Sequence, residues 1–322
     1  MDIQGRLSIS VHRRIFACKK ALFRLSSQIS GNDRPASDPF ISGDSFRALA
    51  QHAFDSVGKD TALPSIQKRD IVFVASTCMK EFFESMHPRI REPYILITHN
   101  GDEPVDQGLA DKIDGKIIHW FAQNADAVHP RLTPIPIGIE NLSYYQNGPV
   151  SVIKRIAGKA KAQQAGKLGR ILYHFKVKTN PAERQPALDY FKGNALSETI
   201  ANKLPQNLYL KVLASYMFVA SPPGNGIDCI RTWEALYLRT VPIVKRSVAM
   251  EYFKSLGLPL LMVQEWNELN GYTEDALTEA YKGIMSSSAR EPLYMDYWKR
   301  LIETRKKEHA DAPRSNKMLS SD

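Results

Sequence analysis

Short apolar runs alternate along the chain with longer segments in which apolar and polar positions recur at helical spacing. The apolar runs cover residues 71–74, 94–97 and 117–121 in the first half and 170–175, 216–220, 241–244 and 258–263 in the second. Runs that are apolar on both faces, with room between them for a crossover helix, are typical of buried parallel strands. The pattern therefore predicts an α/β fold with two successive parallel sheets.

The same pattern predicts the domain boundaries. Residues 1–150 are expected to form the first α/β domain, and the Pro-rich run 133–138 closes its strands because proline cannot sit inside a helix. Residues 151–169 are polar and basic, which is typical of a partly helical connector. Residues 170–305 form the second domain, with its closing helices, and the highly charged residues 306–322 are expected to be a solvated tail.

Residues 6–28 mix basic side chains with apolar ones and allow two interpretations. A partly amphipathic segment of this kind can lie on an anionic membrane surface. Alternatively, it is an ordinary first element, mostly helical from Val11 onward, with its apolar side in the core.

Composition narrows the class of protein. In 322 residues, 43% hydrophobic and 24% charged, there is enough apolar material for a large core, which excludes a disordered or collagen-like chain. The formal charge of +9 favours anionic partners. Three cysteines without CxxC spacing favour a reducing compartment, and no apolar stretch reaches the ~20 residues that span a bilayer. We expect a cytoplasmic protein.

The segment 221–244 carries the clearest chemical signal, because it reads as a glycine turn, a helix and a strand. Glycines 224 and 226 allow a sharp turn and close approach to a ligand, and the N-terminus of the following helix attracts phosphate. Helical spacing places Cys229, Ile230, Trp233, Leu236 and Tyr237 toward the sheet, with Arg231 and Glu234 on the opposite side. A guanidinium there suits a diphosphate and a carboxylate suits a sugar diol, although the two could also form a simple surface ion pair.

The run Pro-x-Gly-x-Gly-x-Asp-x-x-Arg-x-Trp-Glu-Ala-Leu, followed by Val-Pro-Ile-Val, resembles the donor-binding signature of exostosin-like glycosyltransferases (glycosyltransferase family 47). The resemblance is specific over about residues 216–245, and a strand ending at Phe175 followed by Asn180 and Arg184 supports it. It implies a GT-B architecture, in which two Rossmann-like domains face a central cleft. The donor-binding residues it implies are Gly224, Asn225, Gly226, Asp228, Arg231, Glu234, Asn180 and Arg184, with the diphosphate on the glycines and Arg231 and the ribose or sugar on Glu234.

Two features depart from that family's pattern. Many members have glycine where this chain has Arg239, and a long side chain there affects the end of the helix. The membrane anchor of the animal exostosins is also missing from this sequence, which favours a cytoplasmic enzyme of bacterial type.

The first domain would then supply the acceptor site and the catalytic base. The sequence Thr98-His99-Asn100-Gly101-Asp102-Glu103-Pro104 follows an apolar run directly, at the end of a sheet where α/β proteins place their sites. An inverting transferase needs one base for the acceptor hydroxyl, and His99, Asp102 and Glu103 are the candidates, with Asp102 the first choice. The alternative is a plain turn, since Asn-Gly-Asp favours turns in any protein.

Another loop, with Asn124, Asp126 and His129 followed by residues 136–141, is expected to line the cleft by analogy with the family, or else to be purely structural. His119, inside an apolar run, is expected to be a core histidine.

Missing motifs exclude several other classes. Without Asp-x-Asp, HExxH or zinc-type Cys/His spacing, the sequence predicts no metal site and no cofactor besides the donor substrate. Cys229 stands where the third glycine of a dinucleotide fingerprint would be, which argues against a dehydrogenase. Neither GxxxxGK[ST] nor GxSxG occurs, and no nucleic-acid-binding pattern is present.

The sequence thus predicts a metal-independent, inverting hexosyl- or pentosyltransferase of polysaccharide biosynthesis. It would move a sugar from a nucleoside diphosphate sugar to a glycan or lipid-linked saccharide, and the basic N-terminal segment could hold it at the inner membrane face. The alternative is a non-catalytic protein of GT-B-like fold that binds glycans, nucleotides or polyanions.

Overall fold

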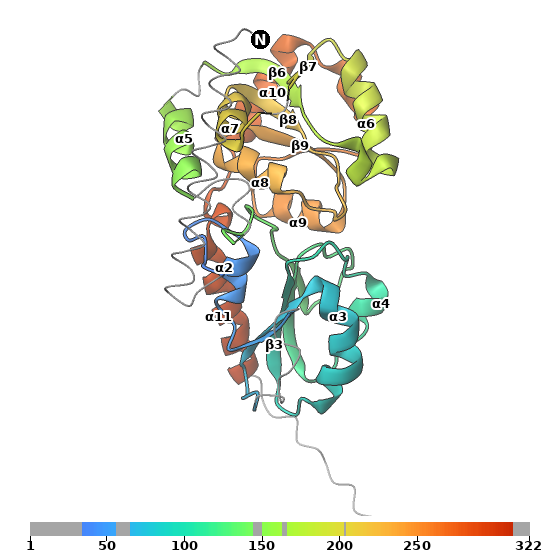
Figure 1. The fold of residues 1–322 in the computed structure, drawn as a ribbon, viewed down its shortest axis with the longest axis vertical. Helices are drawn as coiled ribbons and strands as arrows, with labels where there is room; N and C mark the ends of the chain where they lie inside the picture. The colour runs from blue at the N-terminus through green and yellow to red at the C-terminus, as the bar shows by residue number, and fades with distance from the viewer. Residues whose placement is uncertain (1–33, 56–64, 144–149, 163–165, 203, 312–322) are drawn as a thin grey trace, which may run out of the picture.

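A computed structural model describes residues 34–55, 65–143, 150–162, 166–202 and 204–311. It has two α/β domains, one below the other in Figure 1, each built on a parallel sheet of five strands. The predicted α/β architecture with two successive parallel sheets is confirmed, and a cavity lies between the two domains. The segment 6–28, with its two interpretations, lies outside the described residues.

The sheet of the N-terminal domain has the order β1-β2-β3-β4-β5. Its strands are β1 (His52–Phe54), β2 (Ile71–Ala75), β3 (Tyr94–His99), β4 (Ile117–Ala122) and β5 (Leu132–Pro134). Every residue of β2, β3 and β4 is buried, which is why these strands are apolar on both faces and were readable in the sequence.

The sheet of the C-terminal domain has the order β10-β9-β8-β6-β7. Its strands are β6 (Leu168–Tyr173), β7 (Ser197–Thr199), β8 (Tyr216–Ala220), β9 (Val241–Lys245) and β10 (Leu261–Val263). The chain runs from β6 to one side to form β7, and then crosses to the other side of β6 to form β8. The order of the strands therefore reverses between β6 and β8, and such a switch point opens a crevice at the carboxyl ends of the strands.

The helices cover the sheets and connect the strands (Figure 1). The α-helices are α2 (Gly43–Arg47), α3 (Met79–Glu81), α4 (Gln107–Ala110), α5 (Val150–Ala162), α6 (Pro181–Gly193), α7 (Gln206–Ala214), α8 (Ile230–Tyr237), α9 (Val248–Ser255), α10 (Glu274–Ser286) and α11 (Met295–Asp311). Short 3-10 or π segments are η1 (Ser76–Cys78), η2 (Phe82–Met86), η3 (His87–Arg89), η5 (Val177–Thr179), η6 (Trp266–Gly271) and η7 (Glu291–Leu293).

The predicted connector 151–169 is largely helix α5, which begins one residue earlier. Ile153 and Ile156 on α5 are buried in the same hydrophobic cluster as Leu210 and Leu213 of α7, and α5 also contacts α8. By its packing, α5 therefore belongs to the C-terminal domain.

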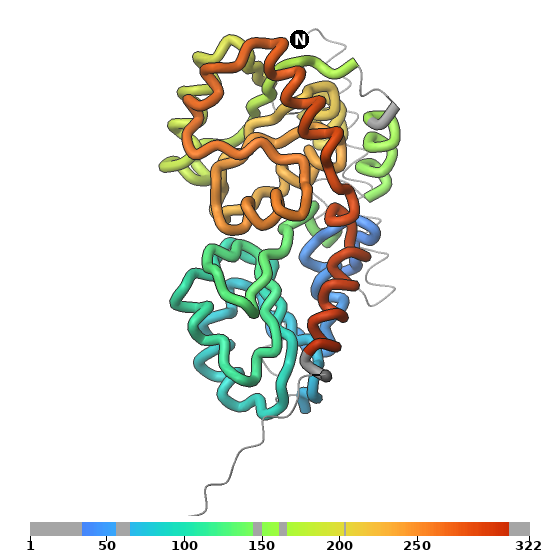
Figure 2. Tube along the Cα trace, turned by 180° about the vertical axis from the view of Figure 1, so that it is seen from behind, coloured from blue at the N-terminus to red at the C-terminus, as the bar shows by residue number. Residues whose placement is uncertain are grey.

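Helix α11 crosses back from the C-terminal domain to the N-terminal one, where it lies alongside α2 (Figure 2). The Trp298 ring is fully buried, with its centroid 6.4 Å from that of Phe46, and Lys299 forms a 2.6 Å ion pair with Asp38. The helix continues to Asp311, so residues 306–311 are helical where the sequence led us to expect a solvated tail. The boundary at 305 consequently does not coincide with a change of structure.

Candidate functional site

A cavity of ≈ 490 Å³ lies at the switch point of the C-terminal sheet. It is lined by the loop 174–179 after β6, by the first turns of α8 and by side chains from residues 200–209. We call it the C-terminal cavity. Its position follows from the strand order, because the loops after β6 and β8 turn away from each other and leave room between them.

Arg231, in the first turn of α8, supplies a cation to this cavity. Its Nη1 atom is buried and has no hydrogen-bond partner among the described residues. Its Cζ atom lies 5.9 Å from the centroid of the Phe175 ring, and its charge opposes the burial that raises the pKa of Tyr209. A buried guanidinium with an unused donor is costly unless an anionic ligand completes its hydrogen bonds.

The N-terminus of α8 adds to this positive potential. Cys229 occupies the N-cap position, and its side chain makes no capping hydrogen bond. By contrast, Asn180, Ser247 and Thr273 cap α6, α9 and α10 with their side chains. A helix N-terminus that no side chain caps keeps its free N–H groups and its partial positive charge for another acceptor.

Glu234, one turn along α8, is buried, in contrast to the outward orientation that helical spacing suggested. Only 4% of the residue is exposed, and its Oε1 accepts a 2.5 Å hydrogen bond from Gln206 Nε2. Burial raises the pKa of Glu234 to about 8, with the nearby Glu140 carboxyl acting in the same direction and Arg231 opposing it. Glu234 lines the C-terminal cavity and carries a proton near neutral pH. It is not part of a solvated surface ion pair.

Asn180 and Arg184 are occupied by structural hydrogen bonds. Asn180 donates to the carbonyl of Gly224 over 2.7 Å, and Arg184 donates to the carbonyls of Pro223 and Lys176. Together they fix the loop after β6 against the glycine turn. Arg184 still lines the C-terminal cavity, whereas Asn180 does not.

The glycine turn lies against other residues of the protein, from both domains. A Cβ atom on Gly226 would lie 2.4 Å from Asn124 Nδ2 of the N-terminal domain, and one on Gly224 would lie 3.0 Å from Arg184 Nη2. The Asn225 side chain donates a 3.0 Å hydrogen bond to Asp102 Oδ2 across the cleft. The turn lines a separate hollow together with Lys245, Arg246 and Glu265, and it does not line the C-terminal cavity. The close approach at Gly226 is to the other domain, whereas Gly224 approaches Arg184 of its own domain.

Asp228 also joins the two domains. Its Oδ2 accepts hydrogen bonds from the backbone N–H of Ile137 (2.8 Å) and from Trp233 Nε1 (2.7 Å), and its Oδ1 accepts from the N–H of Cys229. Burial raises the pKa of Asp228 to about 7 against the effect of these three donors. The carboxylate is therefore directed into the protein and away from the C-terminal cavity.

A second cavity, of ≈ 360 Å³, lies between the domains, and we call it the interdomain cavity. Its walls come from residues 99–102 after β3, residues 137–141 after β5, Gly43 and Gln123. Ile230 at the start of α8 lines both cavities, so the two are neighbours. Of the expected cleft loops, residues 137 and 139–141 line this cavity, whereas Asn124 reaches the C-terminal domain by accepting the N–H of Asp228.

His99 lines the interdomain cavity, but both of its ring nitrogens are used. Nε2 donates to the carbonyl of Pro136 over 3.0 Å, and Nδ1 accepts the N–H of Asn100 over 2.7 Å. Burial lowers the pKa of His99 to about 4. His99 is therefore a neutral structural group near neutral pH. Glu103 is exposed and lines neither cavity, so Asp102 alone of the three predicted bases presents a carboxylate to the interdomain cavity.

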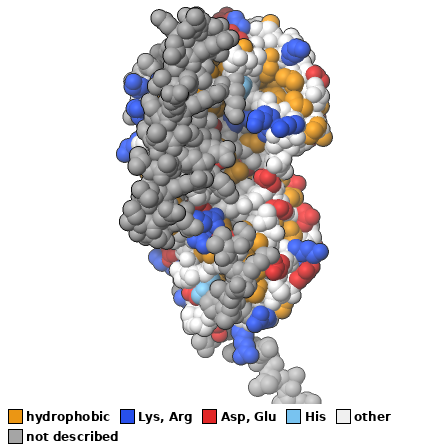
Figure 3. All heavy atoms as spheres, viewed as in Figure 1, with side chains coloured by type: hydrophobic (Ala, Val, Ile, Leu, Met, Phe, Trp, Pro, Cys, Tyr) orange, Lys and Arg blue, Asp and Glu red, His pale blue; other side chains and the backbone are white. Residues whose placement is uncertain are grey.

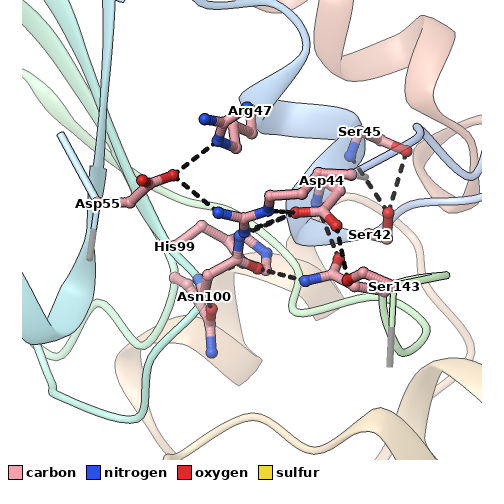
Figure 4. A network of polar contacts seen from close by, with 11 residues as sticks. Ser42, Asp44, Ser45, Arg47, Asp55, His99, Asn100 and Ser143 are labelled. Atoms are coloured by element: carbon pink, nitrogen blue, oxygen red, sulfur yellow. Dashed lines mark hydrogen bonds and ion pairs between the residues drawn. The ribbon is translucent and has the colours of Figure 1, made fainter. Parts of the chain in front are cut away.

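A network of polar contacts supports the wall beside His99 (Figure 4). Asp44 is fully buried at the start of α2, and its Oδ1 accepts hydrogen bonds from Arg34 and from Asn100 Nδ2. Asn141 donates to Asn100 Oδ1 and accepts the N–H of Asp44. Asn100 has a left-handed backbone (φ 60°), which asparagine tolerates better than most residues. The network fixes one wall of the cavity.

Sequence reasoning missed Glu140, Gln206 and Tyr209. Glu140 lines the interdomain cavity and is close enough to Glu234 to raise its pKa. A carboxylate in a Gly-Ile-Glu-Asn loop carries no periodic signal, although the loop itself was expected to line the cleft. Gln206 and Tyr209 belong to α7. The hydrophobic pattern of this helix identifies the side that packs on the core but not the residues that line a cavity. His119, by contrast, is buried and bonded to Thr133 as expected.

In the described segments, no group of three or more His, Cys, Asp or Glu side chains is placed to hold a metal ion. No described helix has both the length and the apolar character needed to cross a membrane.

Comparison with known proteins gives weak structural likenesses. No protein-family model and no curated protein matches the sequence, so the exostosin-like resemblance stays a prediction. The structure is similar to that of the spinosyn rhamnosyltransferase SpnG complexed with thymidine diphosphate (12% identity, TM-score 0.35, covering 95% of this chain and 80% of that one). It is also similar to the alpha,alpha-trehalose 6-phosphate synthase of Burkholderia multivorans (8% identity, TM-score 0.41, covering 76% and 73%).

Proposed function

We propose that the protein is a glycosyltransferase that moves a sugar from a nucleoside diphosphate sugar to a glycan or lipid-linked saccharide. The observation that carries the proposal is the Nη1 atom of Arg231, which is buried without a hydrogen-bond partner in the described part of the chain, beside the uncapped N-terminus of α8. A diphosphate is the ligand that completes both groups, because it accepts charge-assisted hydrogen bonds from the guanidinium and from backbone N–H groups.

The rest of the C-terminal cavity suits the nucleoside and the sugar. Phe175, Tyr209 and Leu204 offer apolar and aromatic surface, and Gln206 and Glu234 offer hydrogen-bonding groups. Glu234 in its protonated form both donates to and accepts from a diol. Asn180 and Arg184 act on the donor indirectly, by holding the loop after β6.

The interdomain cavity would hold the acceptor. A carboxylate of this cavity, Glu140 or Asp102, accepts the proton of the acceptor hydroxyl, whose oxygen attacks the anomeric carbon of the donor sugar. The bond from that carbon to the diphosphate oxygen breaks, and Arg231 stabilises the charge on the departing diphosphate, so that no metal is required. Displacement from the opposite side inverts the anomeric configuration.

We expect Glu140 to be the stronger candidate for the base. It lies near Glu234, where the two cavities meet. Loss of a general base lowers the rate by ~10²–10⁴-fold.

The test is turnover of a panel of nucleoside diphosphate sugars with glycan acceptors, comparing wild type with Glu140→Gln, Asp102→Asn and Glu103→Gln. The exposed Glu103 is the matched control, because it lies next to Asp102 and outside both cavities. We expect a loss of activity for Glu140→Gln and wild-type activity for Glu103→Gln. Nucleotide binding without turnover of any donor would instead identify a binding protein of the same fold.

A further inference from the structure

The two domains meet where the surface of the molecule narrows in Figure 3, and Asn124 is one of the residues at this contact. It follows β4 in the N-terminal domain, only 1% of it is exposed, and its backbone is left-handed, with φ 54°. Its carbonyl accepts the N–H of Val105 over 3.0 Å, and the next residue, Ala125, pairs with Val105 as an isolated parallel bridge. Asn124 is therefore held firmly by its own domain.

The side chain of Asn124 fits against the glycine turn of the other domain. Its Oδ1 accepts the N–H of Asp228 over 3.0 Å, and its Nδ2 donates to the carbonyl of Asp102 over 3.3 Å. A Cβ atom on Gly226 would come within 2.4 Å of Nδ2 and 3.0 Å of Cγ and Oδ1. The turn has room for this amide group because residue 226 has no side chain.

Asp228 connects this contact to helix α8. Its Oδ1 accepts the N–H of Cys229, the N-cap residue, and its Oδ2 accepts from Trp233 Nε1 inside the helix. Its Oδ2 also accepts the N–H of Ile137 from the N-terminal domain. The start of α8 is thus held from the other domain. Helices α6, α9 and α10 differ, because N-cap side chains of their own domain bond to their first turns.

We infer that Asn124 is a positioning residue for the nucleotide, because it fixes the glycine turn and, through Asp228, the N-terminus of α8 that receives the diphosphate. The inference rests on the proposed function, which assigns an anion to that helix N-terminus. Asn124 lines neither cavity, so it acts through the turn and does not touch the nucleotide. Chains of hydrogen bonds between rigid elements carry such an effect from one domain to the other.

The experiment is calorimetric titration of uridine, adenosine, guanosine and thymidine diphosphates into wild type, Asn124→Gly and Gly226→Ala, at a temperature at which each protein is folded. Glycine adopts a φ of 54° without strain, so Asn124→Gly removes the side chain alone. In Gly226→Ala the added methyl group displaces the Asn124 amide. We expect each variant to bind nucleotide at least ~5-fold more weakly, which corresponds to the loss of about one hydrogen bond.

Lys299→Met is the matched control. Lys299 of α11 forms an ion pair with Asp38, which is another contact with the N-terminal domain, and it lies outside the glycine turn and both cavities. We expect this variant to bind nucleotide as the wild type does.

The double variant Asn124→Gly/Gly226→Ala tests whether the two residues act through each other. Once the amide group is gone, the added methyl group no longer meets it. Gly226→Ala should therefore weaken nucleotide binding several-fold less in the Asn124→Gly background than in the wild type.

Hydrogen exchange at the Asp228 amide follows the contact without any nucleotide, and we expect it to be faster in Asn124→Gly. The melting temperature reports the loss of stability separately, because destabilisation alone does not change the affinity of a protein that remains folded. Gly226→Ala provides the test if Asn124→Gly does not fold.

The possible results separate the inference from the proposed function. Wild-type nucleotide affinity in folded Asn124→Gly overturns the inference even if the Asp228 amide exchanges faster, and it leaves the donor site standing. An equal loss of affinity in Lys299→Met overturns it too, because any weakening of the domain contact would then suffice, and so do additive losses in the double variant. If the wild type binds none of the nucleoside diphosphates, the proposed function fails and the inference falls with it.

Discussion

At the residue scale, the buried Nη1 atom of Arg231 indicates a ligand site. Proteins normally satisfy buried donors, because an unmet hydrogen bond costs ~1–3 kcal/mol. The Nη1 of Arg231 is unmet among the described residues, while Arg184, on the same cavity, has its guanidinium bonded to two carbonyls. The contrast separates a ligand-facing arginine from a structural one, although the sequence presents both as candidates.

Glu234 permits a test of its protonation. Its pKa of about 8 in the folded protein lies above the ordinary value of 4.5, so the folded state binds the proton more tightly than the unfolded chain does. The resulting stabilisation is complete below about pH 4.5 and is lost as the pH rises through about 8. Glu234→Gln has no carboxyl group to ionise and therefore does not lose this stabilisation. Its free energy of unfolding relative to that of the wild type should rise by ~1–3 kcal/mol between about pH 6 and about pH 9.

Thermal or urea unfolding across that pH range measures the difference. Glu279→Gln, at an exposed position of α10, is the control, and its stability should depend on pH in the same way as that of the wild type. If Glu234→Gln also ran parallel, Glu234 would be ionised throughout and its assigned environment would be wrong.

At the scale of elements, the sequence predicted those strands and helices that have a clear hydrophobic pattern. The long buried strands β2, β3, β4, β8 and β9 were identified within one or two residues of their ends. The edge strands β1 and β7 were missed because they have three residues each, and β7 (Ser-Glu-Thr) is not apolar. The helical spacing of α8 predicted correctly that Trp233 is buried, but it predicted an exposed Glu234. Glu234 is buried because other elements cover α8 on more sides than they cover a surface helix.

The end of α8 explains the departure noted at Arg239. Arg239 follows the helix with φ 57°, a left-handed conformation that glycine adopts without steric cost. We expect Arg239→Gly to be more stable than Arg239→Ala by ~1 kcal/mol, since both lose the side chain and only alanine keeps the strain. Chemical denaturation of the two variants measures this. Equal stabilities would show that the backbone there is unstrained.

At the scale of the whole molecule, contacts between the domains lay beyond the sequence pattern. The family resemblance implied that the glycine turn, Asp228 and Asn225 bind the donor. Close backbone approach and polar side chains mark a domain contact as well as a ligand site. Only the structure shows that Gly226 meets Asn124 and that Asp228 receives the N–H of Ile137. The packing of α11 against both domains could not be predicted either, because the hydrophobic pattern of a helix does not indicate which element it packs against.

Asp228→Asn tests this domain contact. Asparagine has one acceptor oxygen in place of two, so at least one of the three buried N–H donors loses its partner at a cost of ~1–3 kcal/mol. We expect lower stability and faster hydrogen exchange at the Ile137 amide. Asn225→Ala removes a single, exposed interdomain bond and should change stability by less than ~0.5 kcal/mol. Unchanged protection of Ile137 in Asp228→Asn would contradict the role given to Asp228.

The central claim is that Arg231 in the C-terminal cavity binds the diphosphate of a nucleotide sugar. Calorimetric titration of nucleoside diphosphates into wild type, Arg231→Ala and Arg246→Ala tests it most directly, because Arg246 lies in the separate hollow beside the glycine turn. We predict selective binding by the wild type, affinity lowered at least ~10-fold in Arg231→Ala, and no change in Arg246→Ala. Undiminished affinity in Arg231→Ala, or loss only in Arg246→Ala, would contradict the claim and move the anion site to the glycine turn.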